Sequence, residues 1–125
     1  MADANKRKQR LEKLSQICLS LPEAVRKELD SHASFAVGKK VFAYYLNDHH
    51  GDGMVSLCCK VLPGDNERLI TASPRKFYMP AYTGPRGWVA LRLDRPTVDW
   101  NEVKELVRCS YEQMAPKKLL QRLIS

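Results

Sequence analysis

Basic and aromatic residues lie close together between Arg68 and Arg92, a segment without any acidic residue. Lysine and arginine neutralise phosphates, and aromatic rings stack on bases, each stack contributing about 1–3 kcal/mol. If rings and cations share one surface, that surface has the chemistry of a nucleic-acid interface. The candidate contact residues, some of them outside this segment, are Lys39, Lys40, Lys60, Arg75, Lys76, Tyr78, Arg86, Trp88 and Arg92.

The same residues also fit a second interpretation, in which the aromatic rings pack against protein and do not stack on bases. A tryptophan beside an arginine on a sheet often forms a cation–π pair that covers the sheet, and exposed apolar area also marks interfaces between proteins. A homodimer or another protein partner is therefore the alternative to DNA. The glycines and prolines of TGPRG indicate a turn, because they lack the GxGxxG spacing before a helix that cradles phosphates.

Other reactive side chains form no catalytic or metal-binding pattern. The turn NDHHGDG, residues 47–53, contains His49 and His50, but adjacent histidines in a short turn are usually solvated. Cys58 and Cys59 are neighbours on a strand and point to opposite faces, which disfavours a redox pair. We therefore expect no enzymatic activity, no metal or cofactor, and no small-molecule substrate.

Composition predicts one domain over residues 1–125. The chain has 44% hydrophobic and 28% charged residues, and its length suffices for one core without disulfides or metal. Lysine and arginine outnumber acids by 21 to 14, giving a net charge of +7, which favours anionic partners. Several of these cations lie near the amino terminus, where we expect a solvated helix face, with phosphate contact as the alternative: Lys6, Arg7, Lys8, Arg10 and Lys13.

The chain lacks the sequence features of secreted and membrane proteins. Its amino terminus is polar, and no apolar run approaches the ~20 residues that a membrane span requires. The four cysteines show neither zinc-finger spacing nor a CxxC pair, so reduced thiols are expected. We predict a cytoplasmic protein that does not associate with membranes.

Hydrophobic periodicity predicts the elements that position these residues. Apolar residues from Leu11 to Leu21 recur at helical spacing, and a capping box of Ser20 and Glu23 favours a short helix over LPEAVRKEL. Aromatic and β-branched runs then predict three strands, SFAVGKK, KVFAYYLN and MVSLCCKVL. A helix over NERLITAS, two strands over KFYMP and GWVALRLD, a helix capped by Asp99, and a last amphipathic segment follow.

These elements predict an α+β fold with the order α-β3-α-β2-α. We expect a two-layer α/β sandwich, in which an antiparallel five-stranded sheet carries all helices on one face. Strand alternation and helical spacing predict a shared core of Val55, Leu57, Val89, Leu91, Leu106 and Val107. The same alternation places the following residues on the opposite, open face: Lys60, Lys76, Tyr78, Trp88 and Arg92.

The segments HASFAVGKKVFAYY, SLCCK, FYMPAYTGPRGWVALRLD and DWNEVKELVRCSYEQMAPKKL, taken in this order, resemble the MmcQ/YjbR family of small bacterial proteins over about residues 21–120. The first contains the family's GxKxFA element, spelled here from Gly38 to Ala43. The resemblance implies a CyaY-like or secretion-chaperone-like fold and a proposed role in DNA binding through a double-wing arrangement. It implies no enzyme activity. We therefore predict a weak, largely nonspecific DNA-binding module, with a protein-interaction or dimerisation module as the alternative.

Overall fold

The computed structural model describes residues 2–48 and 53–124. Within them, six antiparallel strands form one sheet in the order β1-β2-β3-β4-β6-β5. The strands are β1 (Val25–Leu29), β2 (His32–Val37), β3 (Lys40–Asn47), β4 (Val55–Lys60), β5 (Phe77–Tyr78) and β6 (Trp88–Arg92). The helices are α1 (Ala2–Leu19), α2 (Asp65–Ala72), α3 (Trp100–Met114) and α4 (Lys117–Ile124), and a 3-10 turn, η2, covers Gly84–Arg86.

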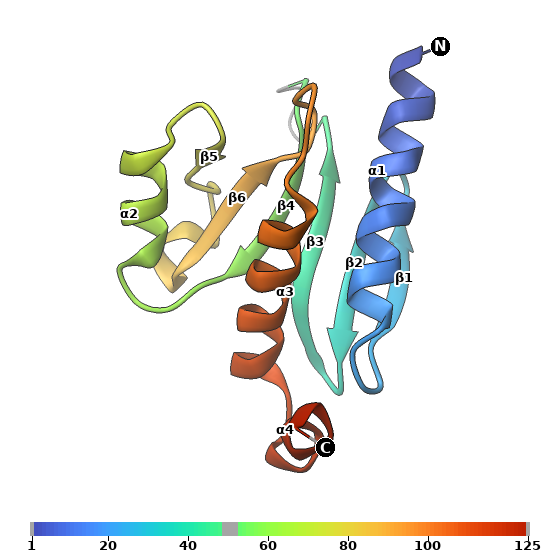
Figure 1. Cartoon of the computed structure of the whole chain (residues 1–125), viewed down its shortest axis with the longest axis vertical. Coiled ribbons are helices and arrows are strands. Elements are labelled where there is room, and N and C mark those ends of the chain that lie inside the picture. Colours follow the sequence, from blue (N-terminus) through green and yellow to red (C-terminus); the bar gives the residue numbers. More distant parts are fainter. Residues whose placement is uncertain (1, 49–52, 125) are drawn as a thin grey trace.

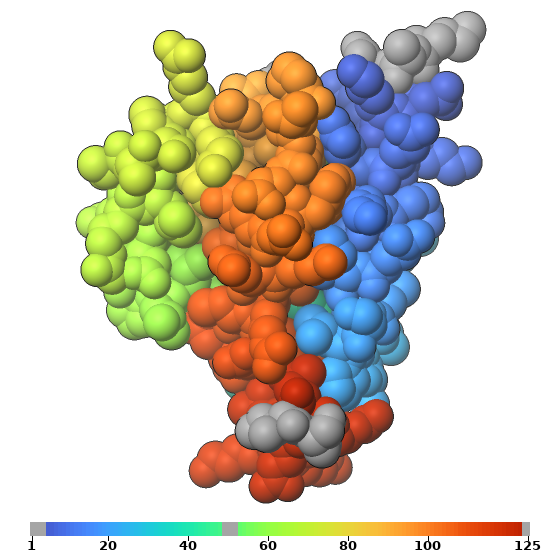
Figure 2. Space-filling model, in the orientation of Figure 1, coloured from blue at the N-terminus to red at the C-terminus, as the bar shows by residue number. Residues whose placement is uncertain are grey.

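Helices α1 and α3 lie across one face of the sheet (Figure 1). Helix α2 lies beside β5 at one side, and α4 continues from α3 beyond the end of the strands (Figure 1). In the space-filling view of this face, α3 lies between α1 and α2 (Figure 2). The predicted α+β fold is confirmed. None of the helices in residues 2–48 and 53–124 has the length and apolar character that a membrane span requires.

The predicted count of five strands is one too low, because β1 forms where we expected a short helix over residues 21–29. The capping box expected from Ser20 and Glu23 is replaced by another bond, since the Ser20 hydroxyl donates to the carbonyl of Ile17 at 2.7 Å. Strand β1 then pairs with β2 through a two-residue turn. This turn begins at Asp30, whose φ of 57° is a left-handed conformation that aspartate adopts more readily than most residues.

The core lies between the sheet and the α1–α3 layer. One buried cluster contains all six residues that were predicted to pack together: Val55, Leu57, Val89, Leu91, Leu106 and Val107. Tyr111 of α3 belongs to the same cluster. Its hydroxyl donates to the carbonyl of Pro22 at 2.7 Å, so it ties α3 to the segment that precedes β1.

Ser110 of α3 connects two strands at the point where their regular pairing ends. The ladder between β3 and β4 begins at Ala43 and Cys59. One residue beyond it, the Ser110 hydroxyl donates to the Phe42 carbonyl at 2.6 Å and accepts the N–H of Lys60 at 3.0 Å. The buried hydroxyl thus bridges β3 and β4 and fixes α3 against both.

Ser110→Ala is expected to lower the free energy of unfolding by about 1–3 kcal/mol, because it leaves a buried N–H and a buried carbonyl without a partner. Urea unfolding followed by far-UV circular dichroism measures this loss. Ser31→Ala, at an exposed turn position, is the matched control and should change stability by less than about 0.5 kcal/mol. Equal urea midpoints for Ser110→Ala and wild type would contradict the bridging role.

All four cysteines are free thiols, and three of them, Cys18, Cys58 and Cys59, are buried. Burial raises the pKa of each buried thiol. For Cys58 burial raises the pKa to about 11, although a contact with the Thr83 hydroxyl acts in the opposite direction. These thiols are therefore protonated and unreactive near neutral pH, since the thiolate is the reactive form.

The raised thiol pKa values predict a loss of stability at alkaline pH. Above about pH 9 a thiol ionises in the unfolded chain, whereas the folded Cys58 stays neutral until about pH 11, so unfolding releases a proton. The free energy of unfolding should fall across this window, with a contribution from Cys58 of the order of 2–3 kcal/mol. Urea unfolding at a series of pH values should show a smaller fall in Cys58→Ala than in wild type. Identical pH profiles would contradict the assignment.

Candidate nucleic-acid interface

Trp88 lies on the predicted side of the sheet, opposite the core, but it is only 6% exposed. Its ring centroid lies 5.8 Å from that of Tyr44, with 46° between the ring planes. Because β4 separates β6 from β3, the two rings meet across β4, near the buried Cys58. The prediction that Trp88 presents a stacking surface on an open face is therefore wrong, and the packing interpretation describes this side chain.

The turn between β5 and β6 is held against the sheet next to Trp88. Thr83 of this turn lies 3.7 Å from the Cys58 sulfur, measured from its hydroxyl oxygen. Asn66 of α2 is buried, and its side-chain amide donates to the carbonyls of Gly84 and Trp88 at 3.0 and 3.1 Å. The segment is thus a turn, as predicted, and hydrogen bonds fix it against both α2 and β6.

Tyr78 is half-buried, and its hydroxyl oxygen lies 2.7 Å from the hydroxyl oxygen of Ser56 on β4. Ser56 is itself fully buried. Tyr78 therefore contributes a hydrogen bond to the sheet, and part of its ring is covered.

Two of the predicted phosphate contacts form ion pairs within the protein. The Lys76 Nζ lies 2.9 Å from the Glu102 Oε1. Arg92 binds Asp94 through two bonds, from Nε at 3.1 Å and from Nη2 at 2.9 Å. Partly exposed pairs of this kind contribute little to stability, about 0–1 kcal/mol, but their carboxylates already compensate the charges of both cations.

Four of the other predicted cations lie at one end of the sheet, which we call the basic end. Its members are Lys39 in the turn between β2 and β3, Lys40 at the start of β3, Lys60 at the end of β4, and Arg86 just before β6. The strand register places them at one end, because Lys60 faces Trp88 across the β4–β6 ladder. Its neighbour Cys59 faces Ala43, three residues from Lys40, across the β3–β4 ladder.

Arg75 belongs to the opposite end of the sheet. It is exposed and lies just before β5. The carbonyl of its neighbour Lys76 accepts the backbone N–H of Arg92 at 2.8 Å. Arg92 stands four positions along β6 from Trp88, a separation of about 13 Å in a strand. The predicted contact residues therefore divide between two ends and do not form one surface.

The cations of the basic end are available to an anion. None of the four forms an ion pair with a carboxylate of the described residues, and all except the half-buried Lys60 are exposed. Lys60 and Arg86 line one hollow of about 660 Å³ together with Gln113. Glu67 also lines this hollow, but its carboxylate forms no ion pair with either cation. Gln113 also donates to the Lys60 carbonyl at 3.0 Å, so the backbone that carries Lys60 is fixed from α3.

Sequence reasoning missed two further lysines at this end. Lys117 and Lys118 are exposed in the first turn of α4, and α4 lies at the same end of the molecule as the turn between β2 and β3 (Figure 1). The signal that could have identified the lysines is the adjacent pair that directly follows Pro116.

The histidine pair considered as a metal site, His49 and His50, lies outside the described residues. Within the part of the chain that the structure describes, no group of three or more histidine, cysteine, aspartate or glutamate residues is arranged to hold a metal ion.

Comparison with known proteins identifies one family. A family model described as YjbR matches residues 19–113, which contain every strand of the sheet and nearly all of α3. The crystal structure of Deinococcus radiodurans protein DR2400, with the family domain DUF419, is similar at a TM-score of 0.66 and 26% sequence identity, covering 81% of this chain and 75% of that chain. None of the curated proteins matches.

Proposed function

The chain belongs to the YjbR family, and we propose that it is a small, non-enzymatic module of the cytoplasm that binds DNA weakly and with little sequence preference. The observation that carries the proposal is the basic end, where Lys39, Lys40, Lys60 and Arg86 lie together without acidic partners among the described residues. The net charge of +7 acts in the same direction. Cations that neutralise phosphates release condensed counterions, and this release drives nonspecific binding.

The proposed contacts are made to the phosphate backbone. Phosphate contacts orient a protein on DNA but carry no direct sequence information. Trp88 is buried and therefore supplies no stacking surface, so we expect no preference for single strands from this ring. We expect affinity for duplex DNA in the range of nonspecific complexes, with a Kd of about 10⁻⁴ to 10⁻⁶ M at physiological salt.

Fluorescence anisotropy with labelled duplex and single-stranded DNA tests the proposal. Binding should be measurable at about 50 mM salt and should weaken steeply towards about 200 mM, with a linear dependence of log K on log salt. Absence of binding to both DNA forms at low salt would refute the proposal.

A protein-interaction or dimerisation module is the second candidate, and exposed apolar side chains on the edge strand β1 favour it. Val25 is 58% exposed and Leu29 is 41% exposed. A second chain could pair with the outer edge of β1, because an edge strand leaves a row of backbone groups unpaired. Self-association that persists at high salt would support this candidate, since apolar contacts are not screened by ions.

A further inference from the structure

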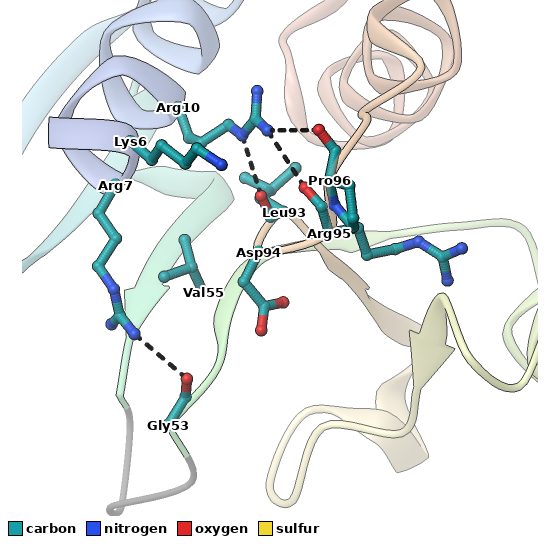
Figure 3. Close-up of a pocket in the computed structure, with 9 residues that line it drawn as sticks. All are labelled: Lys6, Arg7, Arg10, Gly53, Val55, Leu93, Asp94, Arg95 and Pro96. Carbon is teal, nitrogen blue, oxygen red and sulfur yellow. Dashed lines mark hydrogen bonds between the residues drawn. The ribbon is translucent and has the colours of Figure 1, made fainter. Parts of the chain in front are cut away.

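A second group of cations lines a pocket between the first turns of α1 and the segment that follows β6 (Figure 3). The pocket has a volume of about 360 Å³, and the cationic residues that line it are Lys6, Arg7, Arg10 and Arg95. The guanidinium of Arg95 extends away from the other three (Figure 3). The first three belong to α1 before residue 19, where the match to the family model begins. The pocket is therefore distinct from the basic end and draws most of its charge from outside the matched region.

The pocket has an excess of positive charge. None of its four cations forms an ion pair with a carboxylate of the described residues. Asp94 also lines it, but Arg92 binds both oxygens of this carboxylate, at 3.1 and 2.9 Å. Buried Val55 and Leu93 supply apolar lining, and an apolar surface strengthens the attraction between the cations and an anion.

Carbonyl groups hold the guanidinium of Arg10 in place (Figure 3). Its Nε donates to Leu93 at 3.2 Å, and its Nη2 donates to Arg95 at 3.2 Å and to Pro96 at 3.4 Å. An arginine has five N–H donors, so the two on Nη1 are left without a partner among the described residues. The guanidinium is thus fixed before any ligand arrives, while its charge and two donors stay available.

Arg7 is fixed in a similar way. Its guanidinium donates to the side-chain oxygen of Asn47 and, at 3.3 Å, to the carbonyl of Gly53. The hydroxyl of Tyr45, on β3, donates to the Arg7 carbonyl at 2.9 Å and holds this turn of α1 against the sheet. Side chains that are already ordered lose little entropy on binding, which favours affinity.

We propose that this pocket binds the terminal phosphate of a small organic phosphate. A phosphomonoester carries a charge of about −1.5 to −2 at pH 7, which the excess of cations can compensate, and the arginine fork matches phosphate geometry. The volume is near the lower limit of small-molecule sites, about 300–1,000 Å³. The ligand is thus a small molecule, and this site does not depend on the proposed DNA binding.

Isothermal titration calorimetry at constant ionic strength tests the proposal with three probes: inorganic phosphate, glucose 6-phosphate and adenosine monophosphate. Glucose and adenosine are the matched controls without phosphate. Saturable one-to-one binding of the phosphate-bearing probes, and none of the controls, is expected. The relative affinities of the two esters show whether a sugar or a nucleoside better fits the rest of the pocket. Affinity should also rise from about pH 5.5 to about pH 7.5, because the second phosphate proton dissociates near pH 6.

A pair of variants on one helix locates the site. Lys6 lines the pocket and Lys8 does not, yet both are exposed, so Lys6→Gln and Lys8→Gln remove the same charge at little structural cost. We expect Lys6→Gln to weaken phosphate binding about fivefold or more and Lys8→Gln to leave it within about twofold. Equal weakening by the two variants, or no saturable phosphate binding by wild type, would overturn the proposal. Anisotropy with duplex DNA on the same proteins reports separately on the DNA proposal.

Discussion

Replacing Trp88 by alanine is expected to lower the free energy of unfolding by about 3–5 kcal/mol, the usual cost of truncating a buried tryptophan. Trp88 is 6% exposed and its ring packs 5.8 Å from that of Tyr44. The truncation leaves a cavity across β4, beside Cys58, which the turn between β5 and β6 cannot fill because Asn66 and Thr83 hold it in place. Urea unfolding followed by far-UV circular dichroism measures the loss, since the change also removes a fluorophore.

Tyr82→Ala is the matched control for an aromatic truncation on the same turn, because Tyr82 is 76% exposed. Its effect should stay within about 0.5 kcal/mol. Trp88→Phe should lie between the two variants, since phenylalanine fills part of the cavity. A Trp88→Ala protein that is as stable as wild type but binds single-stranded DNA more weakly would contradict the packing role and restore the stacking interpretation.

Trp88 also illustrates what strand alternation can and cannot predict. The period of two is local, so it correctly placed Val89 and Leu91 in the core cluster and left Trp88 out of that cluster. The exposed fraction of a side chain, in contrast, is also set by residues that are distant in the sequence. That of Trp88 depends on Tyr44, from a strand that is not adjacent to β6, and on a turn whose conformation Asn66 fixes from α2.

Of the two predicted helix caps, the structure contains the one at Asp99 but not the one at Ser20. Asp99 caps α3 as predicted, because its carboxylate accepts the N–H groups of Asn101 and Glu102. Ser20 also had a capping pattern, but its hydroxyl bonds backwards to the end of α1. The segment after it gains more from pairing with β2 than from a short helix, since isolated short helices are marginal in water. A competing bond of this kind is not visible in the spacing of residues.

The ion pairs could be predicted from the sequence only where both partners lie close together along the chain. Arg92 and Asp94 stand two positions apart, on one side of an extended chain, so their pairing could have been predicted. Lys76 and Glu102 meet only because the fold brings the first turn of α3 close to Lys76, which directly precedes β5. These pairs remove two cations from the predicted interface. Of the predicted cations without an ion pair among the described residues, Lys39, Lys40, Lys60 and Arg86 lie at the basic end, whereas Arg75 lies at the other end of the sheet.

Replacing Lys39, Lys40, Lys60 and Arg86 together by glutamine is expected to flatten the salt dependence of duplex binding. Each lost phosphate contact reduces the slope of log K against log salt by about 0.9, so four contacts account for a change of about 3 to 4. Affinity at about 50 mM salt should fall by a factor of 100 or more, roughly tenfold for every 1.4 kcal/mol of lost attraction. Anisotropy titrations across the salt series measure both quantities, and circular dichroism verifies that the variant is folded.

A charge-matched variant separates a defined interface from a general effect of net charge. Replacing the exposed Lys8, Lys13, Lys27 and Lys104 by glutamine also removes four charges, so both variants carry +3 where the natural chain carries +7. These four lysines lie outside the basic end, on α1, β1 and α3. If phosphates contact the basic end directly, the basic-end variant should lose most of the slope of log K against log salt. The charge-matched variant should keep this slope, because a distant charge is screened beyond about 10 Å at 0.1 M salt. Equal slopes in the two variants would show that binding follows net charge alone, and the proposed interface would be wrong.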